Sequence, residues 1–193
     1  MFHFRLLISI LGLFFISACT HIPDDSGADS APKLFLDPEQ IEDAIPTIEP
    51  LSRYGNPSSY EIKGVRYHLL NSNENYREVG KASWYGNKFH GRLTSNREIY
   101  NMYEMTAAHK TLPIPCYVEV TNLENGRKAI VRVNDRGPFI EDRIIDLSYA
   151  AATKLGVLDN GTATVLVKQI GPIQSTTQDA KQQATHNSTM QPG

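Results

Sequence analysis

The sequence predicts a mainly β fold, a small barrel that carries one short helix. Two segments rich in β-branched residues, 117–121 and 129–133, flank an Asn-Gly pair at 125–126, which is the strongest short signal for a β-hairpin. A third such segment spans residues 163–170. Only residues 149–155 have the composition of a helix. Short strands with many turns and a single helix are typical of a small β-barrel.

The predicted helix has signals at both of its ends. Ser148 precedes it, and a serine side chain can accept a hydrogen bond from a backbone N–H of the first turn. Gly156 follows it and can take the left-handed conformation that ends many helices. Asp146 lies just before the cap, where an acid interacts favourably with the helix dipole. We therefore expect a structural role for Asp146.

Composition divides the chain into five parts. They are a signal peptide (1–18), a disordered tether (19–50), an extended arm (51–79), the barrel (80–170) and a disordered tail (171–193). The signal begins with Arg5 and continues as a short apolar run, as secretory signals do. The tether holds eight acids, one base and five prolines, and the tail is polar, so neither can bury enough apolar area to order itself. The arm alternates apolar and polar residues as strands do.

Small residues stand directly before Cys19 at the end of the apolar run. This resembles the lipobox of bacterial lipoproteins, in which the cysteine sulfur takes a diacylglycerol and the new amino group receives an acyl chain such as palmitate. Several acyl chains hold a protein at a membrane more firmly than one does. The next residue is Thr20 rather than Asp, which by the same resemblance implies the periplasmic face of the outer membrane. An ordinary signal with a cysteine near its cleavage point is the other interpretation.

Cys116 is left without a partner once Cys19 carries lipid, so we expect no intramolecular disulfide. It stands beside an apolar segment, where a small buried thiol is the first interpretation. A nucleophilic thiol paired with His109 is the second. His90 and His109 lack the spacing of a zinc site and no Cys/His cluster supports one, so we expect neither a metal nor a cofactor.

Four sequence strings, taken together and in order, point to a known family. They are 82–86 (Ala-Ser-Trp-Tyr-Gly) with 89–92, then 105–113, then 133–139 (Val-Asn-Asp-Arg-Gly-Pro-Phe) and 144–148. The combination resembles the rare lipoprotein A family, whose barrel is related in fold to barwin, expansins and some cellulases. The resemblance implies a six-stranded double-psi β-barrel. It also implies a lytic transglycosylase that cleaves MurNAc-GlcNAc bonds in stem-peptide-free glycan strands of peptidoglycan and leaves 1,6-anhydroMurNAc ends.

By matching motif, the family's catalytic positions fall on Glu98, His109 and Asp135. One carboxyl group can protonate the leaving oxygen and then take the proton of the sugar's own C6 hydroxyl, whereas ordinary glycosidases need two positioned carboxyl groups. We expect Asp135 to be that group, with Glu98 and His109 orienting it or stabilising the oxocarbenium-like transition state. There are non-catalytic alternatives for two of these residues. Glu98 can be a solvated surface charge, and His109 can bond a neighbouring backbone carbonyl.

Substrate-binding candidates lie close to these positions. Trp84, Tyr85 and Phe89 can form a platform on which sugars stack, although aromatic side chains in a small barrel often belong to the core. Arg136 follows Asp135 and is a further candidate contact. Residues 80–170 hold twelve bases and nine acids, a mildly basic balance that suits an anionic wall polymer. Because these bases form no dense stripe, we expect no nucleic-acid partner.

Two residues depart from the commonest family pattern around Glu98. Arg97 stands where glycine is usual, and Asn101 stands where aspartate is usual. A non-catalytic peptidoglycan-binding or structural lipoprotein is therefore the alternative function. A third class, an adaptor for cell-division proteins, has no sequence signal beyond Cys116 and the arm.

Overall fold

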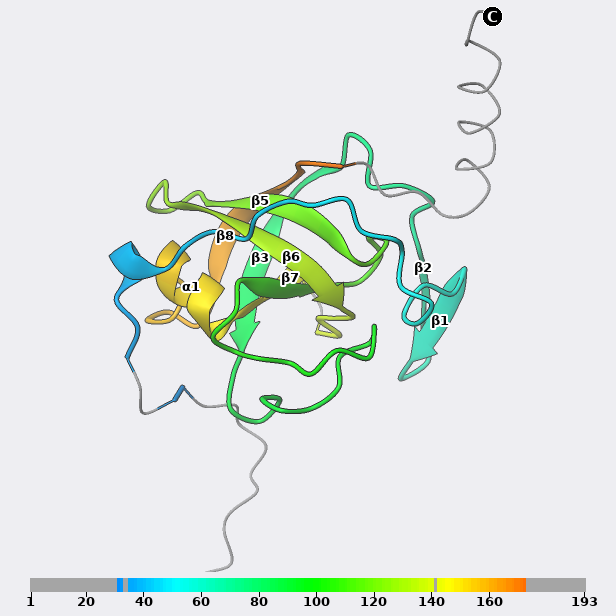
Figure 1. Cartoon of the computed structure of the whole chain (residues 1–193), viewed down its shortest axis with the longest axis horizontal. Helices are drawn as coiled ribbons and strands as arrows, with labels where there is room; N and C mark the ends of the chain where they lie inside the picture. The colour runs from blue at the N-terminus through cyan, green and yellow to red at the C-terminus, as the bar shows by residue number, and fades with distance from the viewer. Residues whose placement is uncertain (1–30, 33–34, 141, 173–193) are drawn as a thin grey trace, which may run out of the picture.

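Six strands form a closed barrel with the strand order β3-β7-β4-β6-β5-β8 (Figure 1). The computed structural model describes residues 31–32, 35–140 and 142–172. The barrel strands are β3 (Arg77–Tyr85), β4 (Thr106–His109), β5 (Cys116–Asn122), β6 (Lys128–Asp135), β7 (Arg143–Ser148) and β8 (Ala163–Gln169). The predicted mainly β fold with a six-stranded barrel is confirmed. The barrel begins three residues before the predicted boundary at residue 80.

Alternating side chains of these strands fill the barrel. In β5 and β6 the inward positions carry Val118, Val120, Val131 and Val133, and all four are completely buried. The two strands pair antiparallel across the turn that the Asn-Gly pair predicts. By contrast, β3 pairs with β7 in parallel, and β4 pairs with β6 in parallel. These parallel pairs join segments far apart in the sequence and determine which residues meet at the site.

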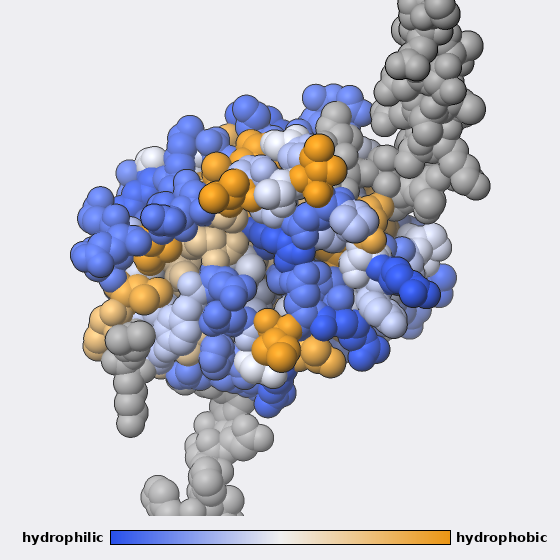
Figure 2. All heavy atoms as spheres, in the orientation of Figure 1, coloured by the Kyte–Doolittle hydropathy of each residue, from blue (hydrophilic) through white to orange (hydrophobic). Residues whose placement is uncertain are grey.

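The helix α1 (Tyr149–Leu155) begins and ends where the sequence predicts. Ser148 Oγ accepts a hydrogen bond from Ala151 N at 3.1 Å, and Gly156 has a φ of 66°. No helix among the described residues is long and apolar enough to cross a membrane. The face shown in Figure 2 is mainly hydrophilic with apolar residues in separate patches, because most large apolar side chains are inside the barrel.

Residues 35–50, which we call the strap, lie along the outside of the barrel and include the 3-10 helix η1 (Pro38–Gln40). The sequence places this segment in the disordered tether, but the structure gives it contacts along its length. Ala44 N donates to Ile130 O of β6 at 3.1 Å, and Leu36 and Ile41 pack against the core. Figure 1 shows the strap crossing the front of β5 and β6. The predicted signal peptide, Cys19 and most of the predicted tail lie outside the described residues.

The predicted arm contains a two-stranded hairpin, formed by β1 (Ser59–Ile62) and β2 (Val65–His68). Its two-residue turn consists of Lys63 and Gly64, with φ angles of 51° and 80°. A turn with positive φ at both central residues matches the twist of an antiparallel pair. The hairpin lies at the opposite end of the barrel from α1 in Figure 1.

Candidate active site

Asp135 and Asp146 lie in one row across three neighbouring strands. Ala108 of β4 pairs with Asp135 of β6 on one side and with Asp146 of β7 on the other. Directly paired residues point to the same face of a sheet, and two strand spacings separate the carboxyl-bearing backbones by roughly 10 Å. Because Ala108 has only a methyl side chain, the space between the two acids stays open.

The two acids share one pocket, with a volume of about 470 Å³. Its lining includes Trp84, Tyr85, Phe89, Ala108, Asp135 and Asp146. The site therefore combines two carboxyl groups with aromatic side chains, the combination expected where a sugar binds and reacts.

Asp135 is held at the end of β6 by three donors to one oxygen. Its Oδ1 accepts hydrogen bonds from Ser95 N at 2.7 Å, Ser95 Oγ at 2.6 Å and Arg136 N at 2.7 Å. These bonds fix the orientation of the carboxyl group and leave Oδ2 as the oxygen that a substrate can engage. The structure thus places the predicted catalytic Asp135 in the pocket.

Asp146 belongs to the same site, although the sequence suggests only a structural role beside the helix. Its Oδ1 accepts a short hydrogen bond from Ser83 Oγ, which in turn accepts from Arg143 Nη1 at 2.9 Å. Burial raises the pKa of Asp146, while the Ser83 bond and the Arg143 charge act in the opposite direction. The helix is capped by Ser148 instead. Asp146 is therefore a half-buried acid that lines the pocket, and desolvation favours its protonated form.

The three aromatic candidates differ in how accessible they are. Tyr85 is 6% exposed and stacks on Tyr100 with ring centroids 4.2 Å apart, so its ring belongs mainly to the core. Phe89 is 41% exposed and contacts Tyr85 edge to face at 5.9 Å. Trp84 is half-buried and tilted against Tyr149. Phe89 and the free part of Trp84 are the surfaces available to a sugar.

Glu98 lies outside this pocket and is held in an ion pair. Its two oxygens accept from Arg132 at 2.7 and 2.8 Å, and Asn134 Nδ2 donates to it at 2.8 Å. The hydrogen bonds from Arg132 lower the pKa of Glu98, against the effect of burial. Its loop also carries Ser95, which bonds Asp135. Glu98 therefore holds the loop that positions Asp135.

Arg132 is shared between Glu98 and the strap. Its Nε and Nη2 donate to the two oxygens of Glu49 at 2.8 and 2.7 Å. Tyr117 Oη donates to the same carboxylate at 2.6 Å. These hydrogen bonds lower the pKa of Glu49, with the Arg132 bond as the largest cause. One arginine thus joins the strap to the loop beside the site.

His109, the third predicted catalytic residue, is 2% exposed and does not line the pocket. Its Nδ1 accepts from Thr111 N at 3.1 Å and Leu112 N at 3.0 Å, so Nε2 carries the proton. Nε2 donates to the Tyr76 hydroxyl at 2.8 Å, and that hydroxyl donates to Glu78. The predicted alternative, a histidine bonded to neighbouring backbone, describes this environment, except that the backbone partners are N–H groups.

Arg136 lines the pocket, but most of its donors bind the protein. Nε donates to Gly55 O at 2.8 Å and Nη2 to Asn56 Oδ1 at 3.0 Å, while Nη1 donates to the carbonyls of His109 and Leu112 at 3.1 and 2.5 Å. Burial lowers the pKa of Arg136 to about 10. These bonds make Arg136 a clamp between β4, β6 and the arm.

The two residues that depart from the family pattern, Arg97 and Asn101, form their contacts with residues other than the two acids of the pocket. Arg97 has a φ of 74°, the left-handed conformation that a glycine adopts freely, and its guanidinium lies 5.4 Å from the centre of the Tyr54 ring. Asn101 accepts from Tyr103 N and donates to Glu104, both at 3.1 Å. Both residues lie outside the lining of the carboxylate pocket.

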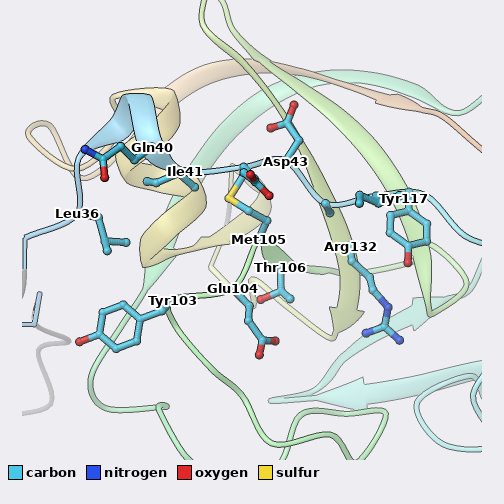
Figure 3. A pocket seen from close by; sticks show the side chains of 13 residues that line it. Leu36, Gln40, Ile41, Asp43, Tyr103, Glu104, Met105, Thr106, Tyr117 and Arg132 are labelled. Atoms are coloured by element: carbon cyan, nitrogen blue, oxygen red, sulfur yellow. The ribbon is translucent and has the colours of Figure 1, made fainter.

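A second pocket, of about 530 Å³, lies between the strap and the barrel (Figure 3). Leu36 and Ile41 of the strap form one side, and Tyr103 and Met105 belong to the other. None of the predicted catalytic residues lines it. In the part of the chain that the structure describes, no three His, Cys, Asp or Glu side chains gather as a metal ion requires. Cys116 is completely buried, and burial raises its pKa to about 12, as expected for an unreactive thiol.

Known proteins resemble this chain over the barrel and beyond. The family described as "Lytic transglycolase" matches residues 77–167. A Vibrio cholerae protein named endolytic peptidoglycan transglycosylase RlpA is 52% identical over 168 residues, which cover 86% of this chain and 64% of that protein. Proteins of the same name from Pseudomonas aeruginosa and Neisseria meningitidis are 56% identical over 146 residues (76% of this chain, 42% of that one) and 55% over 133 residues (69% and 55%).

The chain thus spans 42–64% of the length of these relatives. The matched residues 77–167 coincide with the six strands that form the barrel and its pocket. The chain belongs to the rare lipoprotein A family, and its barrel is the double-psi β-barrel domain of that family.

Proposed function

We propose that the barrel is a lytic transglycosylase, which cleaves MurNAc-GlcNAc bonds in peptidoglycan glycan strands and forms 1,6-anhydroMurNAc ends. The observation that carries this proposal is the row in which Ala108 separates Asp135 from Asp146 within one open pocket. The names of the relatives support it, since each is an endolytic peptidoglycan transglycosylase.

Asp146 is the proposed general acid. Burial favours its protonated form, and a carboxylic acid with a raised pKa can protonate the glycosidic oxygen as the bond to C1 breaks. The resulting carboxylate then takes the proton of the sugar's C6 hydroxyl while O6 bonds to C1. The donated proton stays on the hydroxyl of the released sugar, the proton of the C6 hydroxyl restores the acid form of Asp146, and no water is consumed.

The proposed role of Asp135 is to stabilise the positive charge that develops at C1 in the transition state. Its three donors hold it on the other side of Ala108, so it does not need to reorganise during the reaction. This division of roles differs from the sequence-based expectation, in which Asp135 alone served as acid and base. The raised pKa of the half-buried Asp146, and its place in the pocket beside Asp135, are the reason for the change.

The test uses the full chain, amidase-stripped peptidoglycan and mass spectrometry of the released products. Wild type and the control Asp159→Asn, which changes an exposed acid, should release anhydro-ended glycans. Asp146→Asn and Asp135→Asn should each lower the rate by about a hundredfold or more, the usual contribution of a general acid or a charge-stabilising group. Circular dichroism and thermal melts show whether each variant is folded.

Other products would contradict the lytic mechanism. Reducing ends would mean hydrolysis, because two carboxyl groups with space for water between them also suit an inverting glycosidase. Glycan that is retained in a pull-down but never cut by the wild type would favour the alternative, a non-catalytic peptidoglycan-binding lipoprotein.

We also propose that the mature chain begins at Cys19 and is held by acyl chains at the periplasmic face of the outer membrane. The short apolar run that ends in Ile-Ser-Ala-Cys supports this. Mass spectrometry of the mature N-terminus should find an acylated Cys19, and membrane fractionation should place the protein with the outer membrane. An unmodified N-terminus, or Cys19→Ser protein in the same fraction, would contradict the anchor.

A further inference from the structure

The β1–β2 hairpin forms one wall of the carboxylate pocket. Ile62 and Lys63, at the end of β1 and in the turn, line the same pocket as Asp135 and Asp146. The hairpin is a separate two-stranded sheet, so these residues are not supplied by the barrel itself. A glycan bound at the acids would therefore contact the hairpin as well.

Aromatic contacts hold the hairpin in this position. Tyr60 stacks on Tyr67 with ring centroids 5.2 Å apart, and both rings contact Phe139 of the loop after β6, at 6.0 and 5.6 Å. Tyr60 Oη also donates to Lys110 O at 2.8 Å. Such aromatic clusters have preferred geometries and bury large areas, so the turn has a defined place over the pocket.

A smaller pocket, of about 310 Å³, continues beneath the hairpin. It shares Ile62, Arg136 and Phe139 with the carboxylate pocket and is also lined by Tyr60. Since the two pockets adjoin, a strand of several sugars can run from the acids along the hairpin. The turn residue Lys63 lines the carboxylate pocket and not the smaller one.

Three cationic side chains line the carboxylate pocket, and they are not equally available. Four donors of Arg136 bind backbone and Asn56, and Arg143 donates to Ser83. Lys63 is exposed, and among the described residues its ammonium group has no ion-pair or hydrogen-bond partner. Its φ of 51° is uncommon for a residue other than glycine, asparagine or aspartate. Lys63 is thus the exposed cation of this pocket, whereas Arg136 is bound to the protein and the half-buried Arg143 is bonded to Ser83.

We infer that Lys63 binds the lactyl carboxylate of a MurNAc residue and is the residue by which this site distinguishes stem-free glycan. The inference rests on the proposed function. In a MurNAc-GlcNAc strand the acidic group is the carboxyl of the lactyl ether. Where a stem peptide is attached, this carboxyl group forms the amide bond to the peptide and carries no charge. Removal of the stem exposes a carboxylate that an ammonium group can pair with. A stem-bearing MurNAc has no charge at the lactyl position, and any carboxylates of its peptide lie further from the sugar.

The test compares two forms of the same glycan. Amidase-stripped strands carry free lactyl carboxylates, and carbodiimide coupling with ammonia converts these to uncharged primary amides of nearly the same size. Wild type should cleave the acid form about two- to fivefold more efficiently, the range of a single solvent-exposed ion pair, and the difference should appear in KM rather than kcat. Lys63→Gln should remove this preference, and Lys63→Arg should keep it.

Lys168→Gln is the matched control, because Lys168 is an exposed lysine on β8 that lines neither pocket. This variant should behave as wild type towards both strands. A preference that survives Lys63→Gln, or a wild type that treats the two strands alike, would overturn the inference.

Binding of both strands to Asp146→Asn protein separates the inference from the proposed function. Binding that depends on Lys63 and on the carboxylate, without any cleavage by wild type, would retain the lactyl subsite and reject the lytic activity. If wild type cleaves the strands and the rate does not depend on Lys63, the lytic activity is retained and the lactyl subsite is rejected.

Discussion

Low pH should destabilise this protein through His109, because the folded state disfavours protonation of its imidazole ring. The Nδ1 lone pair already accepts two backbone N–H groups, and the ring is buried. Burial lowers the pKa of His109 from 6.5 to about 3, and the charges of Arg136 and Lys110 act in the same direction. The folded protein therefore contains a neutral imidazole throughout mildly acidic conditions.

The sign and size of the effect follow from these two pKa values. Below pH 6.5 the unfolded chain binds a proton at this residue, whereas the folded chain does so only near pH 3. The free energy of unfolding therefore falls by about 1.4 kcal/mol for each pH unit within that window. Between pH 7 and pH 5 the loss from this one residue is about 2 kcal/mol.

His109→Asn is the decisive variant, because its side-chain oxygen can accept the same backbone hydrogen bonds but cannot titrate. Urea unfolding would be followed by the fluorescence of Trp84, the single tryptophan of the chain, at pH 7, 6 and 5. The wild type should lose about 2 kcal/mol more than His109→Asn over this range, and the exposed control His68→Asn should match the wild type. Equal slopes, or an NMR titration of His109 near pH 6.5, would refute the reasoning.

Two further substitutions test the contacts around the site. Arg136→Lys cannot reproduce the four hydrogen bonds of the guanidinium, so the free energy of unfolding should fall by about 2–4 kcal/mol, against less than about 0.5 for the exposed Arg66→Lys. If the free energy of unfolding falls as little as in the Arg66→Lys control, the hydrogen bonds of Arg136 do not stabilise the contact between the barrel and the arm. Glu49→Gln should weaken the Arg132 contact by about 1–2 kcal/mol and speed amide hydrogen exchange at Ala44, and unchanged exchange would mean that other contacts hold the strap.

Local patterns were sufficient for three of the six barrel strands and for the helix. Segments 117–121, 129–133 and 163–170 fall within or nearly match β5, β6 and β8, because β-branched residues and an Asn-Gly turn act over a few neighbours. Cap residues placed both ends of α1 correctly for the same reason. The closure of the barrel depends on parallel pairing between distant strands, which no local pattern reports.

The site was harder to predict because its partners are far apart in sequence. Asp135 could be identified from its motif, but Asp146 joins it only because both pair with Ala108. The strap looked disordered by composition, since its acids outnumber its bases, yet Glu49 pairs with Arg132 at a separation of 83 residues. A prediction based on charge composition alone treats Glu49 as a solvated side chain.

With the proposed anchor at Cys19, the strap would set how far the barrel can move from the membrane. Ala31 O accepts a hydrogen bond from Asn87 Nδ2 at 2.9 Å, so from the proposed anchor at Cys19 to Ala31 the chain has about twelve links, which span at most about 40 Å when fully extended. If the contacts of Ala31, of the strap and of Glu49 with Arg132 all open, the free length rises to about 100 Å at full extension. In a chain anchored at Cys19, a contact of a few hydrogen bonds on the side of the barrel would thus determine the distance from the membrane that the pocket can reach.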